Sequence, residues 1–253
     1  MNKVVLFGVT QFSSLAWYAL KHDSPYDVVG FTVDRSYYHE EFHEDLPVAP
    51  FEDIQDVYAP DSVSMLLPLG FHSINGLRRK RYEQALAQGY LMTNYVSSRA
   101  ITWPSLNVQK NCLIYEGAVV QPFSRVGQNV IIRSNAHISH HCEIGDHVFI
   151  AAGVTLGGNV VIGEQSFVGL GAVVRDGVTI AERCFIGAGA VVITDTEADG
   201  VYVGNPARKI KRTSLEVTTG LLRGSDEQSG HKFHTHRYVT HKGNDTTCPF
   251  GSK

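Results

Sequence analysis

Hydrophobic positions recur every six residues through the middle of the chain, from Val108 to Val192. A second series, four residues after each of these positions, contains only small or β-branched residues. The aliphatic series runs without an insertion through Val108, Ile114, Val120, Val126, Ile132, Ile138, Ile144, Ile150, Leu156, Ile162, Val168, Val174, Ile180, Ile186 and Val192. A period of six matches neither the 3.6-residue period of an α-helix nor the two-residue alternation of a strand.

The six-residue period predicts a parallel β-helix, in which each hexad supplies one short strand and one corner. Three hexads complete one triangular coil, so the run corresponds to about five coils stacked at roughly 4.8 Å, the spacing of paired strands. The aliphatic residue of each hexad fills the interior and the small residue fits beside it. An ordinary β-sandwich with regular turns is the alternative, but it would not keep this period over the whole run.

Before this run, apolar strand patterns alternate with helical patterns. We expect strands at residues 3–8, 27–34, 64–70 and 91–96, a short edge element at 46–50, and helices at 13–22 and 74–88. This alternation predicts a small α/β, Rossmann-like domain with a parallel sheet. The predicted organisation is therefore an acceptor-binding domain at 1–97, a β-helix domain at 98–212 and a polar, disordered tail at 213–253.

Ligands of doubly wound sheets bind at the carboxyl ends of the strands. This rule selects Gly8, Thr10 and Asp34 as substrate-binding candidates. The segment 8–13 carries one glycine where a full dinucleotide fingerprint has three, so a tight turn without a ligand is the alternative. Asp34 has two readings of equal weight, a ligand for a ribose or sugar hydroxyl and a solvated strand end.

Composition narrows the possible partners. The formal net charge of −3 gives no indication of nucleic acid or of an anionic membrane. The chain has no apolar run of membrane-spanning length, so we expect a cytoplasmic protein. Three cysteines fall in the small inward series and are expected to be buried thiols: Cys112, Cys142 and Cys184. The tail residues His231, His234, His236, His241 and Cys248 have no recognised zinc spacing.

Histidines gather at one predicted corner of the β-helix. Ile138 points inward, so His140 and His141 fall at an exposed corner. One coil above this corner lie Gly157 and Gly158, which have no side chains. We therefore expect room for a ligand and bare backbone amides above the two histidines.

These motifs resemble those of a known family. The segments are Ile138-Ser139-His140-His141-Cys142-Glu143-Ile144-Gly145, Gly157-Gly158-Asn159-Val160, Gly187-Ala188-Gly189-Ala190 and Gly204-Asn205-Pro206-Ala207-Arg208. They look like hexapeptide-repeat acyltransferases of the two-domain bacterial type. This group includes nucleotide-sugar N-acetyltransferases and sialic acid O-acetyltransferase-like proteins. The resemblance covers roughly residues 1–212 and implies a left-handed β-helix.

The resemblance also implies catalytic roles. His140 corresponds to the general base, and a neutral imidazole suits that task near neutral pH. The Gly158 amide corresponds to the oxyanion donor. The family often has an acidic residue directly after the base, whereas this chain has His141, so Glu143 or a backbone carbonyl is left to orient His140. For His137 and His147 a structural role is expected.

By the same resemblance, acetyl-CoA would lie in a groove between two β-helices of a homotrimer, with no metal. Its contacts would fall on Gly157, Gly158, Leu170, Ala188, Asn205 and Arg208. The predicted function is an acetyl-CoA-dependent acetyltransferase for the amino group of a nucleotide-linked amino sugar, as in surface-glycan synthesis.

Other functions were weighed against this one. A sugar O-acetyltransferase and a non-catalytic binding module remain alternatives. A zinc-dependent β-helix carbonic anhydrase would need well-separated histidines, whereas those of the β-helix are confined to residues 137–147. A nucleotidyltransferase would need a glycine-rich, basic N-terminal loop, which the chain lacks.

Overall fold

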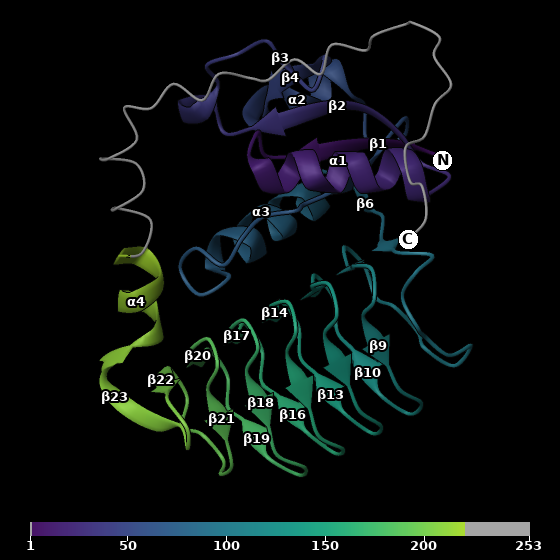
Figure 1. Ribbon diagram of the computed structural model, residues 1–253. Helices are drawn as coiled ribbons and strands as arrows, with labels where there is room; N and C mark the ends of the chain where they lie inside the picture. The colour runs from purple at the N-terminus through teal and green to yellow at the C-terminus, as the bar shows by residue number, and fades with distance from the viewer. Residues whose placement is uncertain (1, 221–253) are drawn as a thin grey trace, which may run out of the picture.

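The computed structural model describes residues 2–220, in which an α/β unit lies along one side of a triangular β-helix (Figure 1). The N-terminal sheet has the order β3-β4-β2-β1-β5-β6, and only β3 runs antiparallel to its neighbour. Its strands are β1 (Lys3–Phe7), β2 (Asp27–Val33), β3 (Phe42–His43), β4 (Leu46–Pro50), β5 (Ser64–Leu66) and β6 (Leu91–Met92). Its helices are α1 (Gln11–Asp23), α2 (Ile54–Val57) and α3 (Gly76–Ala87), with 3₁₀ turns η1 (Arg35–Tyr37) and η2 (Phe51–Asp53).

Apolar side chains are buried on both faces of this sheet. Val4 of β1 belongs to the buried cluster that contains Leu20 of α1, whereas Val5 belongs to the cluster that contains Tyr82 of α3. Because successive side chains of a strand point to opposite faces, α1 and α3 lie on opposite sides of the sheet. The predicted doubly wound arrangement is therefore confirmed.

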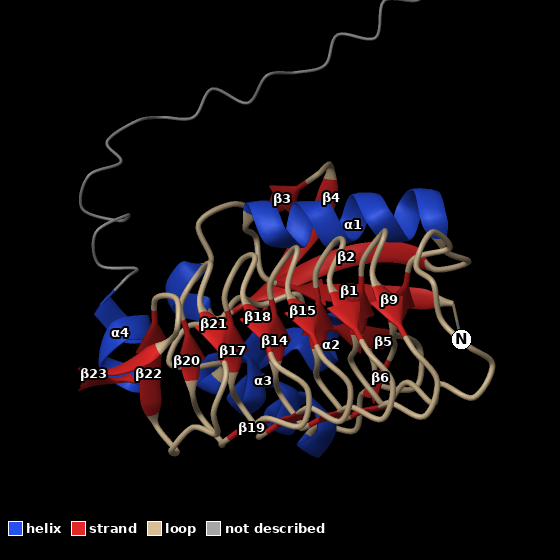
Figure 2. Cartoon of the chain, turned by 60° about the horizontal axis from the view of Figure 1, so that its bottom comes forward, coloured by secondary structure: helices blue, strands red, loops and turns tan. Residues whose placement is uncertain are grey.

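The β-helix consists of two-residue strands that pair in parallel with the strand 18 residues further on, as in Arg125↔Glu143. These strands form three long rows, visible side by side in Figure 2. Face 1 contains β7 (Tyr95–Val96), β8 (Leu113–Ile114), β11 (Ile131–Ile132), β14 (Phe149–Ile150), β17 (Phe167–Val168), β20 (Phe185–Ile186) and β22 (Gly200–Val203), with β23 (Arg208–Thr213) antiparallel at its end. Face 2 contains β9 (Val119–Val120), β12 (His137–Ile138), β15 (Thr155–Leu156), β18 (Val173–Val174) and β21 (Val191–Val192). Face 3 contains β10 (Arg125–Val126), β13 (Glu143–Ile144), β16 (Val161–Ile162) and β19 (Thr179–Ile180).

The interior of the β-helix is filled as the period predicts. The second residue of each two-residue strand points inward, and Ile114, Ile138 and Ile186 are fully buried examples. Cys112, Cys142 and Cys184 are buried and free, so their expected role as core thiols is confirmed. The described fold is that of a left-handed parallel β-helix, as predicted.

Two predicted elements of the N-terminal part have different limits in the structure. The helix expected from Ser13 begins at Gln11, because the Thr10 hydroxyl and the Ser13 hydroxyl form a capping box at its start. The strand expected over residues 91–96 divides into β6, which completes the N-terminal sheet, and β7, which pairs with β8 of the β-helix. The β-helix therefore begins at Tyr95, before the expected boundary at residue 98.

The first part of the expected tail is folded. Residue 213 ends β23, and α4 (Ser214–Gly220) follows directly. Thr218 on this helix is fully buried, and its hydroxyl accepts a hydrogen bond of 2.8 Å from the amide of Ile74. The prediction of a disordered tail from residue 213 is thus wrong for residues 213–220. The tail residues His231, His234, His236, His241 and Cys248 lie outside the described residues.

The N-terminal unit packs on face 1. The outward residues of this face are apolar in each coil, and Leu113, Ile131, Phe149 and Phe167 are buried there. Phe71, from the loop after β5, lies against Phe167 with ring centroids 4.3 Å apart. None of the helices in the described residues has the length and hydropathy to cross a membrane.

Arg78 of α3 is a fully buried cation at this interface. Its guanidinium donates to the carbonyl oxygens of His147 (2.7 Å), Leu69 (3.1 Å) and Asn129 (3.3 Å). Burial lowers the pKa of Arg78 to about 9. Because carbonyls of both units share one cation, Arg78 ties α3 and its loop to the corner of the β-helix between faces 3 and 1.

His147 belongs to a ladder of polar side chains at the same corner. The Leu67 amide donates to Asn111 Oδ1 at 2.9 Å, and Asn111 Nδ2 donates to Asn129 Oδ1 at 2.7 Å. Asn129 Nδ2 lies 2.7 Å from His147 Nδ1, which must then accept and be unprotonated. The expected structural role of His147 agrees with its place in this ladder.

We expect the free energy of unfolding to fall as the pH drops from 6.5 towards 4. Burial, helped by the nearby Arg78 and Arg79 cations, lowers the pKa of His147 from 6.5 to about 4. The unfolded chain therefore binds this proton first, and the contribution of His147, roughly 3 kcal/mol, is present above pH 6.5 and lost below it.

Chemical denaturation at a series of pH values measures this loss. His147→Asn is the matched control, because Asn tolerates the positive φ of 62° at this position and does not titrate. A wild-type profile as flat between pH 6.5 and 4 as that of the control would contradict the assignment.

Candidate active site at two corners of the β-helix

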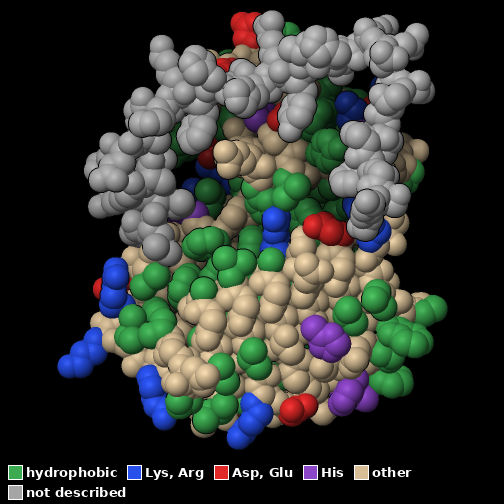
Figure 3. Space-filling view, viewed as in Figure 1, with side chains coloured by type: hydrophobic (Ala, Val, Ile, Leu, Met, Phe, Trp, Pro, Cys, Tyr) green, Lys and Arg blue, Asp and Glu red, His purple; other side chains and the backbone are tan. Residues whose placement is uncertain are grey.

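His140 and His141 lie at the corner between faces 2 and 3, as predicted, and both are exposed. Histidine side chains are visible on the surface of the β-helix in Figure 3. Their Nδ1 atoms are 3.1 Å apart, and the two rings meet at 83° with centroids 5.2 Å apart. The backbone is held as well, because the His140 amide donates to Gln121 Oε1 at 3.0 Å and the His140 carbonyl accepts from the Asn159 amide at 3.0 Å.

Gly158 lies directly against the ring of His140. A β-carbon at residue 158 would stand 2.5 Å from Cε1 and 2.9 Å from Nε2 of His140, which no real side chain allows. The space above the histidines is therefore occupied by the imidazole itself. Glycine at this position lets His140 lie flat over the next coil with its Cε1–Nε2 edge at the corner.

The expected bare amide at this corner is wrong. The Gly158 amide donates to Asp176 Oδ1 at 2.8 Å, and the backbone of Asp176 lies directly above Gly157. Gly157 thus has a packing reason to be glycine. A role for the Gly158 amide as oxyanion donor stays a prediction, and it requires Asp176 to move away.

Gly158→Ala should lower kcat while leaving the fold intact. The φ of Gly158 is not in the left-handed region, so alanine is compatible with the backbone, but its methyl group must displace the His140 ring. A displacement of about 1 Å of a catalytic group typically costs on the order of 100-fold. Steady-state kinetics with Gly171→Ala as a comparison measure this, since no atom lies within 4 Å of a β-carbon there. Equal kcat for Gly158→Ala and wild type would contradict the placement of His140.

The predicted coenzyme residues occupy two different corners. Gly157 and Gly158 share the corner of His140, whereas Leu170 and Ala188 lie at the corner between faces 1 and 2. The cap with Asn205 follows on that second corner, where the Val191 amide donates to the Gly204 carbonyl at 3.0 Å. Arg208 begins β23 and is exposed. The whole width of face 2 separates the two groups within one chain.

The substrate candidates Gly8, Thr10 and Asp34 lie together at the carboxyl edge of the N-terminal sheet. Gly8 follows β1 and Asp34 follows β2, the neighbouring parallel strand. Thr10 is engaged as the cap of α1. Asp34 Oδ2 accepts from Arg81 at 2.6 Å, while its buried Oδ1 has no hydrogen-bond partner among the described residues. Asp34 therefore keeps one free acceptor for a ligand hydroxyl.

A cavity of about 490 Å³ connects this edge with the corner of Leu170 and Ala188. Phe71 and Phe12 form its N-terminal wall, and the stacked rings of Phe167 and Phe185, 4.8 Å apart, form the opposite wall. Arg133 closes it, with its guanidinium 4.7 Å from the Phe12 ring and its buried Nη1 without a partner among the described residues. The cavity can thus receive a ligand that is largely apolar and carries a hydrogen-bond acceptor.

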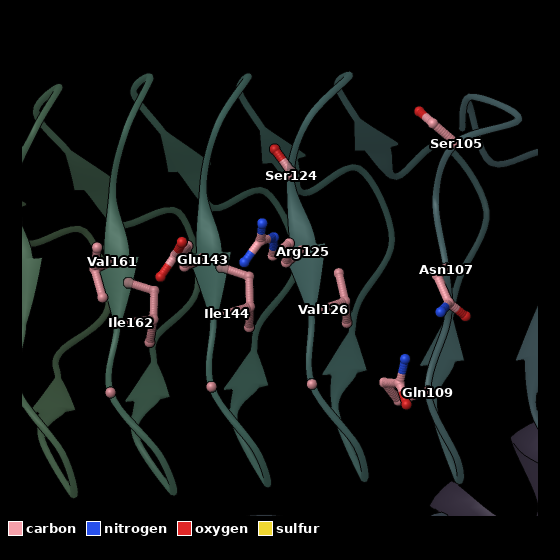
Figure 4. A pocket seen from close by; sticks show the side chains of 13 residues that line it. Ser105, Asn107, Gln109, Ser124, Arg125, Val126, Glu143, Ile144, Val161 and Ile162 are labelled. Atoms are coloured by element: carbon pink, nitrogen blue, oxygen red, sulfur yellow. The ribbon is translucent and has the colours of Figure 1, made fainter.

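A second, wider hollow of about 680 Å³ lies on face 3 (Figure 4). Arg125 and Glu143 occupy neighbouring strands along it, followed by Val161 on the next strand. The predicted catalytic and coenzyme residues are not among those that line it. Glu143 forms no hydrogen bond with His140, whose ring contacts His141 instead. The expectation that Glu143 orients His140 is therefore wrong in this structure.

Large apolar side chains are exposed around face 2 (Figure 3). Leu170 is 60% exposed at one corner of this face, Phe123 is 70% exposed at the other, and Val173 lies between them. Ile101, 58% exposed, pairs with the first strand of the face. Such a patch is typical of a protein–protein interface.

Sequence reasoning missed three residues at these sites: Asp176, Arg81 and Arg133. Asp176 lies 18 residues after Gly158, so the coil repeat predicts that it stands over the Gly157-Gly158 corner. Arg81 and Arg133 come from segments far from their partners in sequence, and no local pattern indicates their contacts.

A parallel prism of hexads with a histidine pair at its corner defines a hexapeptide-repeat transferase fold. The family model for bacterial transferase hexapeptide (six repeats) matches residues 123–158 and 159–194. The acetyltransferase domain of PglB from Neisseria gonorrhoeae FA1090 is 26% identical, with a TM-score of 0.74 over 83% of this chain and 100% of that chain. The same domain in complex with acetyl coenzyme A is 25% identical, with a TM-score of 0.73 over 83% and 99%.

A further solved structure shares the fold. PerB from Caulobacter crescentus, in complex with CoA and GDP-perosamine, is 24% identical, with a TM-score of 0.75 over 83% of this chain and 98% of that chain. Among curated proteins no match was found. The predicted similarity to two-domain hexapeptide-repeat acyltransferases is confirmed.

Proposed function

We propose that this protein is an acetyl-CoA-dependent acetyltransferase that acetylates the amino group of a sugar carried on a nucleotide. The observation that carries the proposal is the His140 imidazole, held at an exposed corner over Gly158. The similarity to the PglB acetyltransferase domain, whose structure contains acetyl coenzyme A, supports the donor. A cytoplasmic location and a part in surface-glycan synthesis are further parts of the proposal.

His140 would act as the general base through Nε2. As the acceptor nitrogen attacks the thioester carbon, Nε2 takes a proton from the amine. Collapse of the tetrahedral intermediate forms the amide, breaks the C–S bond and returns the proton from His140 to the thiolate. Donors for the oxyanion are backbone amides, and the Gly158 amide becomes available only when Asp176 releases it.

We propose a homotrimer in which each active site lies between two copies. Leu170 and Ala188 of one copy would hold the coenzyme, and His140 of the next copy would face the thioester. This arrangement is supported by the separation of the two corners across face 2, since one chain does not bring both groups to one thioester. It would also cover the exposed side chains of Ile101, Phe123, Leu170 and Val173.

The acceptor would bind at the carboxyl edge of the N-terminal sheet. Gly8 and the free Oδ1 of Asp34 offer contacts to the nucleotide part, and the interdomain cavity leads from that edge to Leu170 and Ala188. Residues 1–97 would thus serve as the acceptor-binding domain and residues 98–212 as the acyltransferase domain. The two units share buried contacts, so the acceptor site is tested with point variants rather than by truncation.

The proposal is tested by release of free thiol from acetyl-CoA with a panel of nucleotide-linked sugars. The panel pairs each amino sugar with the matching sugar that has a hydroxyl in place of the amine. We expect thiol release with amino sugars only, reduced by Asp34→Ala through a higher KM. Release with hydroxyl sugars alone would replace the proposal by O-acetylation, and no release from any member would contradict it.

A further inference from the structure

We infer that His141 is a positioning residue, which fixes the tautomer of His140 by accepting a hydrogen bond from it. The inference rests on the proposed function, because it names the group that aims the base. In place of a carboxylate, the chain uses a neutral imidazole. The geometry that supports this is the contact of the two Nδ1 atoms at 3.1 Å.

A neutral imidazole carries one proton, on either Nδ1 or Nε2. Two rings that meet through their Nδ1 atoms form a hydrogen bond only if one of these atoms carries a proton and the other does not. If His141 donates, the proton of His140 must lie on Nε2, and His140 is no base at the corner. If His140 donates, its Nε2 is free at the edge that lies against Gly158, where it can take the proton of an amine.

The surroundings of His141 hold its ring in place. Its ring lies against Phe123, the residue one coil below, with centroids 4.8 Å apart and planes at 34°. Its amide donates to the Pro122 carbonyl at 3.3 Å, and its φ of 58° is left-handed. Its ring is exposed at the corner, so its own Nε2–H can be solvated while Nδ1 accepts.

Three substitutions separate the acceptor from the rest of the side chain, and all three tolerate the left-handed backbone. His141→Asn keeps an acceptor, because Oδ1 of asparagine lies where Nδ1 of histidine does. His141→Gly removes the acceptor. His141→Asp supplies a charged acceptor. His22→Asn, on the exposed face of α1, is the control for loss of a remote histidine.

We expect His141→Gly to lower kcat roughly 10–100-fold, the range for loss of an orienting partner, with little change in KM. His141→Asn should stay close to wild type. His141→Asp should move the acidic limb of the pH–rate profile to higher pH, because a carboxylate favours the imidazolium form of His140. Equal losses in His141→Asn and His141→Gly, or wild-type kcat in His141→Gly, would overturn the inference.

A second measurement does not depend on activity. Nitrogen NMR of histidine-labelled full-length protein at mildly alkaline pH reports which ring nitrogen carries the proton, with His140→Asn used for assignment. The inference predicts a proton on Nδ1 of His140 in the wild type and loss of that preference in His141→Gly. A proton on Nε2 of His140 in the wild type would overturn it. If no sugar is acetylated but Nδ1 is protonated, the proposed function fails and the histidine pair stands.

Discussion

His140→Ala should lower kcat by on the order of 10²–10⁴, the range for loss of a general base. The coenzyme affinity and the free energy of unfolding should change little, because the ring of His140 is exposed and lies over a glycine rather than in the core. The loss should shrink at alkaline pH, where hydroxide and buffer bases take over part of the proton transfer.

Steady-state kinetics with saturating substrates, together with calorimetric coenzyme binding, measure both parts of this prediction. His22→Asn is again the control for a remote histidine. A kcat near that of wild type at neutral pH would exclude His140 as the base and make His141 the next candidate. A parallel loss of coenzyme affinity would instead indicate a binding role.

The β-helix was predictable from the sequence because its period is local. Each aliphatic residue that fills the interior is set by the same six-residue rule, and the corner of His140 follows from the inward position of Ile138. The strand expected over residues 91–96 was not predictable in its divided form, because apolar residues mark both halves. Only pairing with β5 on one side and with β8 on the other separates them.

The interface between the two units was readable in part. Large apolar residues recur every 18 residues at the outward positions of face 1, including Phe149, Phe167 and Phe185, and this indicates that the face is covered. The buried position of Arg78 gave no such signal, because a basic helix normally predicts a solvated surface. Its partners are carbonyl groups of the β-helix corner, which exist only once both units have folded.

The occupied amide of Gly158 was missed for a different reason. The two glycines were read as a vacant corner, although the residue 18 positions after Gly158 is an aspartate. Short-range spacing places glycines and histidines in neighbouring coils, but the direction of a side chain decides which amide it occupies. That direction is visible only in the structure.

Ala188→Trp should abolish measurable coenzyme binding and with it acetyl transfer. Ala188 is exposed at the corner between faces 1 and 2, so a large ring is accommodated without disturbing the interior of the β-helix. It would fill the groove that we assign to the coenzyme. Calorimetry with CoA measures the loss, and Val57→Trp, at an exposed position on α2, is the matched control. Unchanged CoA affinity in Ala188→Trp would remove this corner from the coenzyme site.

The central claim is that His140 of one copy acts on a coenzyme held by the next copy. It is tested most directly by co-expressing His140→Ala and Ala188→Trp chains with different tags and assaying the mixed oligomers. Each variant alone should be inactive, whereas random mixing into trimers should restore about one quarter of wild-type activity, from sites that pair the two intact corners. Mixed oligomers that remain as inactive as either parent would contradict an active site shared between copies.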